Sequence, residues 1–149
     1  SLDNISLLVV GTGNYELQLK YLCKQLHLED IVTFYGFCPR DDLPRLYGES
    51  NIFILPSLAE SFGVVFAEAM ACALPIISTN AGAIPELVQD QNGVLVEPGD
   101  VQALKEAIKD MIDNKEKRRL MGCASRDKIC ANYSWKGVAQ KYSNICRLN

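Results

Sequence analysis

The sequence of 149 residues lacks the features that mark membrane-spanning and metal-binding chains. No apolar run reaches the length of about 18 residues that a membrane span needs, because Glu68, Pro75 and Glu86 interrupt the richest stretch. The six cysteines form no Cys-x-x-Cys pair and no metal-ligand spacing with the single histidine, His27. We therefore expect no metal site, reduced cysteines that lie mostly in the core, and a surface or helix-capping role for His27.

The charge balance argues against polyanionic partners. The chain carries a formal net charge of −3 at pH 7, so it offers no basic surface for nucleic acid or for an anionic membrane. Hydrophobic residues make up 48% and charged residues 22%, which is typical of globular proteins and not of disordered chains. A length of 149 residues suffices for a domain with its own core, so we expect a single domain over residues 1–149.

Short apolar runs alternate with helical patterns along the whole chain. Strands are predicted at 5–10, 31–35, 52–55, 74–78 and 94–96. Helices are predicted at 15–26, 42–48, 62–73, 84–89, 101–112, 115–131 and from Ser134 onward, with Asp100 and Ser134 as caps. This alternation predicts an α/β fold with a doubly wound, Rossmann-like parallel sheet and helices on both faces. In such sheets the ligand binds beyond the carboxyl ends of the strands.

The stretch 56–68 follows the third predicted strand and holds two carboxylates. Glu60 lies just ahead of a predicted helix that is apolar on all sides, and Glu68 lies within it, so Glu68 needs a hydrogen-bond partner. Eight helical residues rise about 12 Å, a span that suits an extended nucleotide-sugar. The first backbone N–H groups of this helix have no intrahelical acceptors and suit a diphosphate or sugar oxygens. They belong to Ser61, Phe62, Gly63 and Val64.

A purely structural interpretation of the same two acids is open. Glu60 can stabilise the positive end of the helix dipole, and Glu68 can pair with a buried Arg or Lys. The two acids alone favour this interpretation, because a pair of glutamates at this spacing arises easily by chance. The G-x-G at 11–13 is also a weak signal, and a tight turn is the favoured role for it.

The flanking motifs change that balance. The segment 56–75 reads P-S-L-A-E-S-F-G-V-V-F-A-E-A-M-A-C-A-L-P, and 79–86 reads T-N-A-G-A-I-P-E. Other matching motifs are V-G-T-G at 10–13, V-T-F-Y-G-F at 32–37 and G-V-L-V-E-P-G-D at 93–100. Together they resemble the retaining glycosyltransferases of group 1 type, a family 4-like group with the two-lobed GT-B fold. The resemblance covers nearly the whole chain and implies the C-terminal, donor-binding lobe without its first strand–helix unit.

The resemblance implies a function and a role for each matching residue. It implies transfer of a hexose from a UDP-, GDP- or ADP-sugar to an acceptor with retention of configuration, in polysaccharide or glycoconjugate biosynthesis. Glu60 is then the catalytic-site acid that contacts the donor sugar, and Glu68 takes the ribose hydroxyls, for which a carboxylate is a suitable acceptor. Donor sugar and diphosphate groups are expected at Glu60, Ser61, Phe62, Gly63 and Val64, and the base at Phe37, Cys38 and Arg40.

The resemblance also implies partners that this chain does not contain. These are the N-terminal lobe of the same full-length chain and an acceptor, which is a sugar, a lipid-linked sugar or a small molecule. No cofactor and no metal are expected, since the nucleotide diphosphate sugar is a substrate. We expect a cytoplasmic protein, with the N-terminal lobe as the route to any peripheral membrane attachment. The cations that stabilise the leaving diphosphate, an Arg and a Lys, are expected upstream of Ser1, so the chain alone is expected to be inactive.

Two departures and two alternatives accompany this prediction. The family usually has Gly where this chain has Ala73 and Ala83, and the second change puts a close backbone approach at that loop in doubt. One alternative is the lobe of a nucleotide-sugar 2-epimerase, which shares the architecture but does not usually carry the motif E-S-F-G-x-x-x-x-E. The other is a non-catalytic nucleotide-binding module.

Overall fold

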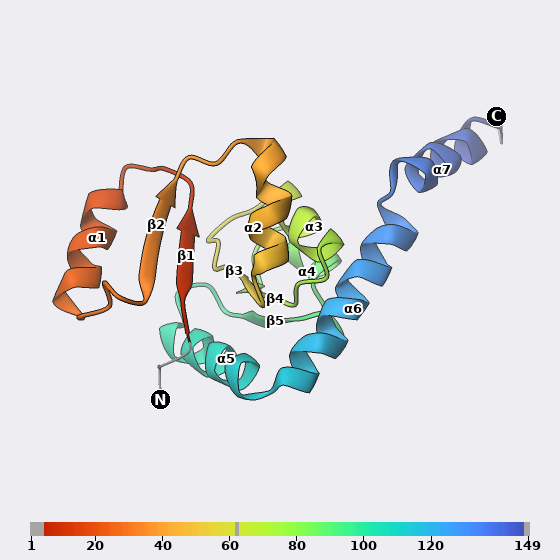
Figure 1. Ribbon diagram of the computed structural model, residues 1–149. Coiled ribbons are helices and arrows are strands. Elements are labelled where there is room, and N and C mark those ends of the chain that lie inside the picture. Colours follow the sequence, from red (N-terminus) through yellow and green to blue (C-terminus); the bar gives the residue numbers. More distant parts are fainter. Residues whose placement is uncertain (1–4, 62, 148–149) are drawn as a thin grey trace. The chain divides into compact units, whose positions relative to one another are not determined.

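The computed structural model describes residues 5–61 and 63–147 (Figure 1). The side chains of residues 135, 141 and 147 lie outside the described part, as does all of Phe62. The chain divides into two compact units, Ser1–Leu43 and Pro44–Asn149, which are described one after the other.

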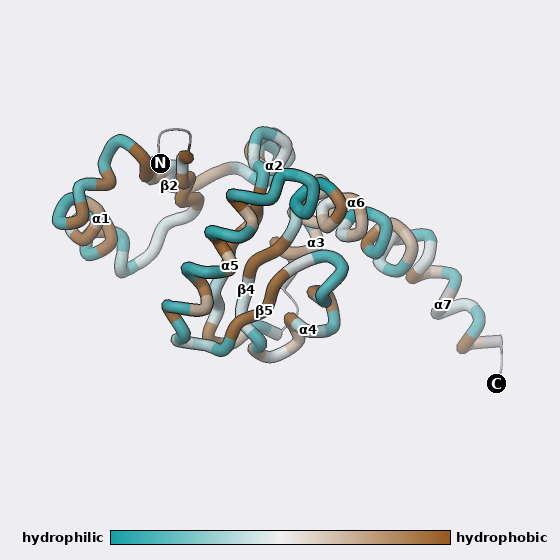
Figure 2. Tube along the Cα trace, turned by 90° about the horizontal axis from the view of Figure 1, so that it is seen from below, coloured by the Kyte–Doolittle hydropathy of each residue, from teal (hydrophilic) through white to brown (hydrophobic). Residues whose placement is uncertain are grey.

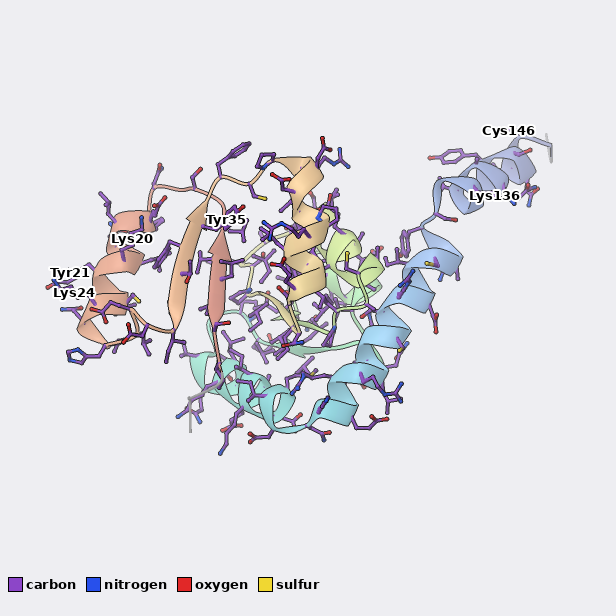
Figure 3. The ribbon with its side chains drawn as sticks, in the orientation of Figure 1. Lys20, Tyr21, Lys24, Tyr35, Lys136 and Cys146 are labelled. Carbon is purple, nitrogen blue, oxygen red and sulfur yellow. The ribbon has the colours of Figure 1, made fainter. Side chains whose placement is uncertain are left out.

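The N-terminal unit is built on two parallel strands. β1 (Leu7–Val10) pairs with β2 (Val32–Gly36), and α1 (Glu16–Gln25) connects them. A short 3-10 helix, η1 (Arg40–Asp42), follows β2. Lys20, Tyr21 and Lys24 project from α1 (Figure 3), and the Lys20 ammonium lies 5.5 Å from the centre of the Phe34 ring. The strand–helix–strand order in this unit is the one that the apolar runs predict.

α1 ends in a left-handed turn at His27. The φ angle of His27 is 54°, and its N–H donates to the carbonyl of Lys24 at 3.2 Å. The N–H of Leu28 donates to the carbonyl of Cys23 at 3.0 Å. These two bonds form a Schellman motif, which satisfies carbonyls at the end of a helix. The predicted surface or capping position of His27 is confirmed.

The C-terminal unit contains a three-stranded parallel sheet in the order β3-β4-β5. The strands are β3 (Phe53–Leu55), β4 (Ile76–Thr79) and β5 (Gly93–Val96). The helices of this unit are α2 (Leu43–Glu49, whose first residue is the last of the N-terminal unit), α3 (Val64–Ala71), α4 (Ile84–Leu87), α5 (Val101–Asp113), α6 (Lys115–Asn132) and α7 (Trp135–Arg147). The predicted caps are confirmed, because Asp100 accepts the Ala103 N–H at 2.9 Å and Ser134 accepts the Gly137 N–H at 3.2 Å.

Alternate strand residues of this unit face opposite sides of the sheet, and both sides are covered. Leu55 and Ile76 pack in a cluster with residues of α3, α4 and α6. Ile77 and Val96 pack in a second cluster with residues of α5. Figure 2 shows the hydrophobic residues along β4 and β5 that these clusters bury. A short strand that is apolar on both faces is typical of a parallel sheet between helical layers.

The parallel pairing and the helices on both faces confirm the predicted α/β fold class. The five strands are hydrogen-bonded as two sheets, β1-β2 and β3-β4-β5. Among the described residues, β1, β2, β3 and β5 each have one edge without a partner strand. No described helix has the length and apolar character to cross a membrane.

The cysteines depart from expectation in their burial. All six are free thiols, but only Cys23 and Cys38 are buried, and three are exposed, namely Cys123, Cys130 and Cys146 (the last labelled on α7 in Figure 3). The inward face of α6 consists of Gly122, Ser125 and Ile129. Cys123 and Cys130 each follow a residue of that face by one position, which on a helix turns the side chain about 100° away from it. The prediction that most cysteines lie in the core is therefore wrong.

α3 ends in a second Schellman motif, and its left-handed residue is Ala73. The φ angle of Ala73 is 60°, its N–H donates to Met70 at 2.9 Å, and the Leu74 N–H donates to Ala69 at 3.1 Å. The carbonyl of Ala73 lies against Gly122 of α6, where an added Cβ would overlap it. An L-residue in this conformation is strained because its Cβ approaches the following carbonyl, and glycine is not. The family's usual glycine at this position therefore has a backbone explanation.

Replacing Ala73 with glycine is expected to stabilise the C-terminal unit. The relief of left-handed strain, about 1–2 kcal/mol, exceeds the added entropy of the unfolded chain, so the net gain is about 0.5–1 kcal/mol. Urea unfolding of Ala73→Gly measures it. Ala124→Gly in the middle of α6 is the control and is expected to lose about 1 kcal/mol. A destabilised Ala73→Gly would contradict the strain argument.

Candidate functional site

The segment that leaves β3 is held by hydroxyl groups of the neighbouring strand. Ser78 and Thr79 of β4 are both buried. Ser78 Oγ donates to the carbonyl of Leu55 at 2.6 Å, and Thr79 Oγ1 donates to the carbonyl of Ser57. Buried hydroxyls are stabilising only when they are hydrogen-bonded, so these two residues fix the course of the chain that leads to Glu60.

The backbone of Glu60 lies directly on the loop that follows β4. The carbonyl of Glu60 accepts the N–H of Ala83 at 3.1 Å, and at the other end of the loop the N–H of Asn80 donates to Val96 at 2.8 Å. Gly82 has a φ of 54°, and a Cβ at Gly82 would overlap the Glu60 carbonyl oxygen. The loop therefore does approach another backbone closely, namely that of Glu60, although Ala83 had put a close approach in doubt. Gly82 is the residue that permits it.

Glu60 lines an open hollow of about 700 Å³ at the carboxyl ends of β3, β4 and β5. Small-molecule sites occupy about 300–1,000 Å³, so the size suits a small ligand. Glu60 is half-buried, and one carboxylate oxygen accepts the Ser61 N–H at 3.1 Å. The other lining residues are Leu58, Ala59, Ser61, Asn80, Ala81, Gly82 and Pro98. The predicted location beyond the strand ends is confirmed for Glu60 and Ser61.

The helix begins two residues later than predicted. α3 starts at Val64, and Gly63 precedes it in a left-handed conformation with φ 70°. The Phe66 N–H donates to the Gly63 carbonyl at 2.9 Å, while the Ser61 N–H is engaged by Glu60. Ser61 and Gly63 thus precede the helix, and the predicted contribution of Phe62 lies outside the described residues. A Cβ at Gly63 would overlap the Phe66 ring, so this turn requires glycine.

Glu68 lies on α3, outside the hollow that Glu60 lines, and is half-buried. The Tyr47 hydroxyl of α2 donates to Glu68 Oε2 at 3.3 Å. The Tyr47 ring packs edge-on against Phe53 with centroids 6.0 Å apart, and Phe53 packs in the same way against Phe66 at 5.6 Å. The prediction that Glu68 needs a hydrogen-bond partner is confirmed, and the partner is itself oriented by the aromatic core.

Sequence reasoning did not find Tyr47, because it stands 21 positions before Glu68 on another helix. The available signal was the aromatic residue in the amphipathic segment ahead of the third strand.

Burial raises the pKa of the Cys72 thiol at the end of α3. Arg126 lowers this pKa, and the nearby Glu68 raises it.

The residues predicted for the base belong to the N-terminal unit. Phe37 is exposed, and Arg40 is exposed at the start of η1. Cys38 is buried, and its thiol donates to the carbonyl of Pro39 at 3.5 Å. A buried Cys38 fits the expectation that it acts through its main chain. In the described part of the chain no group of three or more His, Cys, Asp or Glu side chains could hold a metal ion.

The sequence and the fold both match known proteins. The family model described as "Glycosyl transferases group 1" matches residues 1–128. An N-acetyl-alpha-D-glucosaminyl L-malate synthase of Bacillus anthracis is 35% identical over 140 residues, which cover 93% of this chain and 36% of that protein. A GDP-mannose-dependent monoacylated alpha-(1-6)-phosphatidylinositol monomannoside mannosyltransferase of Corynebacterium glutamicum is 32% identical over 146 residues. The match covers 93% of this chain and 38% of that protein.

A solved structure shares the fold. HepE of Anabaena, solved in complex with UDP and with UDP-glucose, superposes with a TM-score of 0.86 at 27% identity. The superposition covers 99% of this chain and 42% of HepE. The chain therefore spans less than half the length of each of these three proteins.

Adding a methyl group at Gly82 is expected to displace Glu60. The new Cβ meets a backbone carbonyl that cannot rotate away, and the positive φ adds strain, so Gly82→Ala is expected to lose about 2–3 kcal/mol of stability. Gly48→Ala is the matched control, because a Cβ at Gly48 in α2 meets nothing within 4 Å. Urea unfolding of the two variants compares them, and equal stabilities would contradict the role given to Gly82.

Proposed function

Because the chain belongs to the glycosyl transferases group 1 family, as its motifs predicted, we propose that it binds the nucleotide-sugar donor of a retaining hexosyltransferase. The observation that carries the proposal is the position of Glu60, which lines a hollow beyond the strand ends and whose backbone carbonyl is held by the Ala83 N–H. The donor is a UDP-, GDP- or ADP-sugar. A GDP-mannose-dependent relative and a structure solved with UDP and with UDP-glucose support this class without selecting one base.

Glu60 is the catalytic-site acid that contacts the donor sugar. An ionised carboxylate only accepts hydrogen bonds, and sugar hydroxyls donate them. One oxygen of Glu60 is oriented by the Ser61 N–H, which leaves the acid capacity for further donors. Because the Glu60 backbone is fixed by Gly82 and Ala83, little reorganisation accompanies binding, and preorganised polar groups are the effective ones in catalysis.

The start of α3 receives the diphosphate. Gly63, which is buried with a φ of 70°, makes the turn before the helix, and Val64 begins the helix, whose first N–H groups have no intrahelical acceptors. Ser61 contributes its side chain at the hollow, since its N–H is bonded to Glu60. Phe62, which lies between Ser61 and Gly63 in the sequence, is the remaining residue proposed for the donor sugar and the diphosphate.

Glu68 binds the ribose, and the Tyr47 hydroxyl orients it. The two oxygens of a carboxylate can accept from vicinal hydroxyls. Phe37, the Cys38 main chain and Arg40 hold the base. One acid for the hexose and another for the ribose match the two carbohydrate rings of a nucleotide-sugar.

Transfer breaks the bond between the sugar carbon and the diphosphate oxygen, and the electron pair leaves with the diphosphate. The negative charge that develops needs cations or donors aimed at it, and Glu60 is the sole charged residue of the described hollow lining. We assign the cations, the N-terminal lobe and the acceptor site to the full-length protein. The acceptor is a sugar, a lipid-linked sugar or a small molecule, and the enzyme is cytoplasmic or peripheral to a membrane and uses no metal or cofactor.

Nucleotide binding by the chain is expected to depend on Glu68. A titration of the ¹⁵N-labelled chain with UDP, GDP and ADP, followed by NMR, detects millimolar affinities. One nucleotide is expected to bind, and Glu68→Gln is expected to weaken it about tenfold, as for a lost hydrogen bond to a charged group. The 2′-deoxy form of that nucleotide is expected to bind wild type and Glu68→Gln equally weakly.

The matched control is Glu106→Gln, a neutralised carboxylate on the exposed side of α5, which is expected to bind as wild type does. Binding that is insensitive to both substitutions would favour a non-catalytic nucleotide module. Absence of binding by all three nucleotides would refute the proposal.

The chain alone is expected to transfer no sugar. Without cations at the leaving group, hydrolysis of UDP-glucose or GDP-mannose is expected to stay at the buffer rate, as measured by release of the nucleotide diphosphate. Release of the nucleotide diphosphate by the Glu60→Gln variant gives the background rate. Release by wild type above that background would show that the chain carries its own leaving-group stabilisation.

A further inference from the structure

The loops that surround the hollow carry charge of one sign. The carboxyl edge of the β3-β4-β5 sheet is formed by residues 56–61, 80–83 and 97–100. These loops contain three carboxylates, on Glu60, Glu97 and Asp100, and no Lys, Arg or His. The remaining groups of the hollow are an amide, a hydroxyl and apolar side chains. Its chemistry is that of a site for uncharged, hydroxyl-bearing groups.

Asn80 links the hollow to Glu97. It lines the hollow, and its Nδ2 donates to Glu97 Oε1 at 3.5 Å. Its backbone is fixed by the bond to Val96. Asn80 thus lines the hollow on a backbone that is bonded to Val96, and its side-chain amide donates to the exposed Glu97 carboxylate.

We infer that the sugar pocket selects an uncharged hexose and rejects a sugar that bears a carboxylate. The inference rests on the proposed function and deepens it by naming the donor class. Glu60 accepts the hydroxyls of the sugar, and Asn80 contacts the sugar from the opposite loop. A uronate brings a negative charge toward Glu60 and Glu97 in a site whose described lining holds no cation to pair with it. Like charges repel, and the repulsion is moderate here because Glu60 is half-buried and Glu97 is exposed.

The test compares two pairs of donors that differ mainly in one carboxylate. The pairs are UDP-glucose with UDP-glucuronate, and GDP-mannose with GDP-mannuronate, titrated against the ¹⁵N-labelled chain. Within the pair whose base binds, the neutral donor is expected to bind about tenfold more tightly than the uronate, a moderate value because the acids are partly exposed to solvent. The amides of Ala81 and Gly82 are expected to shift with the nucleotide-sugar and not with the nucleotide diphosphate alone.

The Glu97→Gln variant tests how much of the preference for the neutral donor is electrostatic. This substitution keeps an acceptor for Asn80 and removes one charge, so it is expected to reduce the preference for the neutral donor by about threefold. Asn80→Asp adds a charge at the lining itself and is expected to increase the preference. Glu106→Gln is remote from the sheet edge and is expected to leave the preference unchanged.

The outcomes separate this inference from the proposal on which it rests. If no nucleotide binds, the proposed function fails and the inference fails with it. If the nucleotide binds through Glu68 but neutral and acidic donors bind equally, only the inference is overturned. A preference that Glu97→Gln and Asn80→Asp leave unchanged would also overturn it, because the acids would then not be its cause.

Discussion

The backbone of Glu60 lies against the loop at 80–83, and the rest of the candidate site depends on that contact. Two buried hydroxyls of β4 hold the chain that leaves β3, and the Ala83 N–H holds the Glu60 carbonyl at the end of it. Gly82 permits the approach because any side chain there would overlap that carbonyl. The position of the Glu60 backbone is thus set by two side chains of β4 and by the loop that follows β4.

The same arrangement explains how the two acids differ. Glu60 stands at the edge of an open hollow on a fixed loop, whereas Glu68 stands on a helix and is held by Tyr47, whose ring packs on the aromatic core. A carboxylate on a rigid, solvent-facing edge suits the hydroxyls of an incoming sugar. The described lining of the hollow holds no cation for a leaving diphosphate, so our proposal places those cations elsewhere in the full-length protein.

The sequence predicted the strands, the helix caps and the position of Glu60, because these follow from apolar periodicity and local capping chemistry. It misplaced the start of α3, since Phe62 and Gly63 continue the apolar pattern while the left-handed φ of Gly63 is a tertiary property. Tyr47 could not be predicted as the partner of Glu68, because nothing local relates two helices. The exposed cysteines of α6 were misjudged because a residue type indicates average burial and not the face of a helix.

The measurement that tests the central claim most directly is a crystal structure of the chain soaked with a non-hydrolysable nucleotide-sugar. The account predicts hexose density in the hollow with hydroxyls within hydrogen-bond distance of the Glu60 carboxylate, and the ribose against Glu68. The loop at 80–83 is predicted to keep its bonds to Glu60 and Val96, because the site is formed before the ligand arrives. A ligand bound at another edge of the sheet, or a Glu68 enclosed in an internal ion pair, would contradict the account.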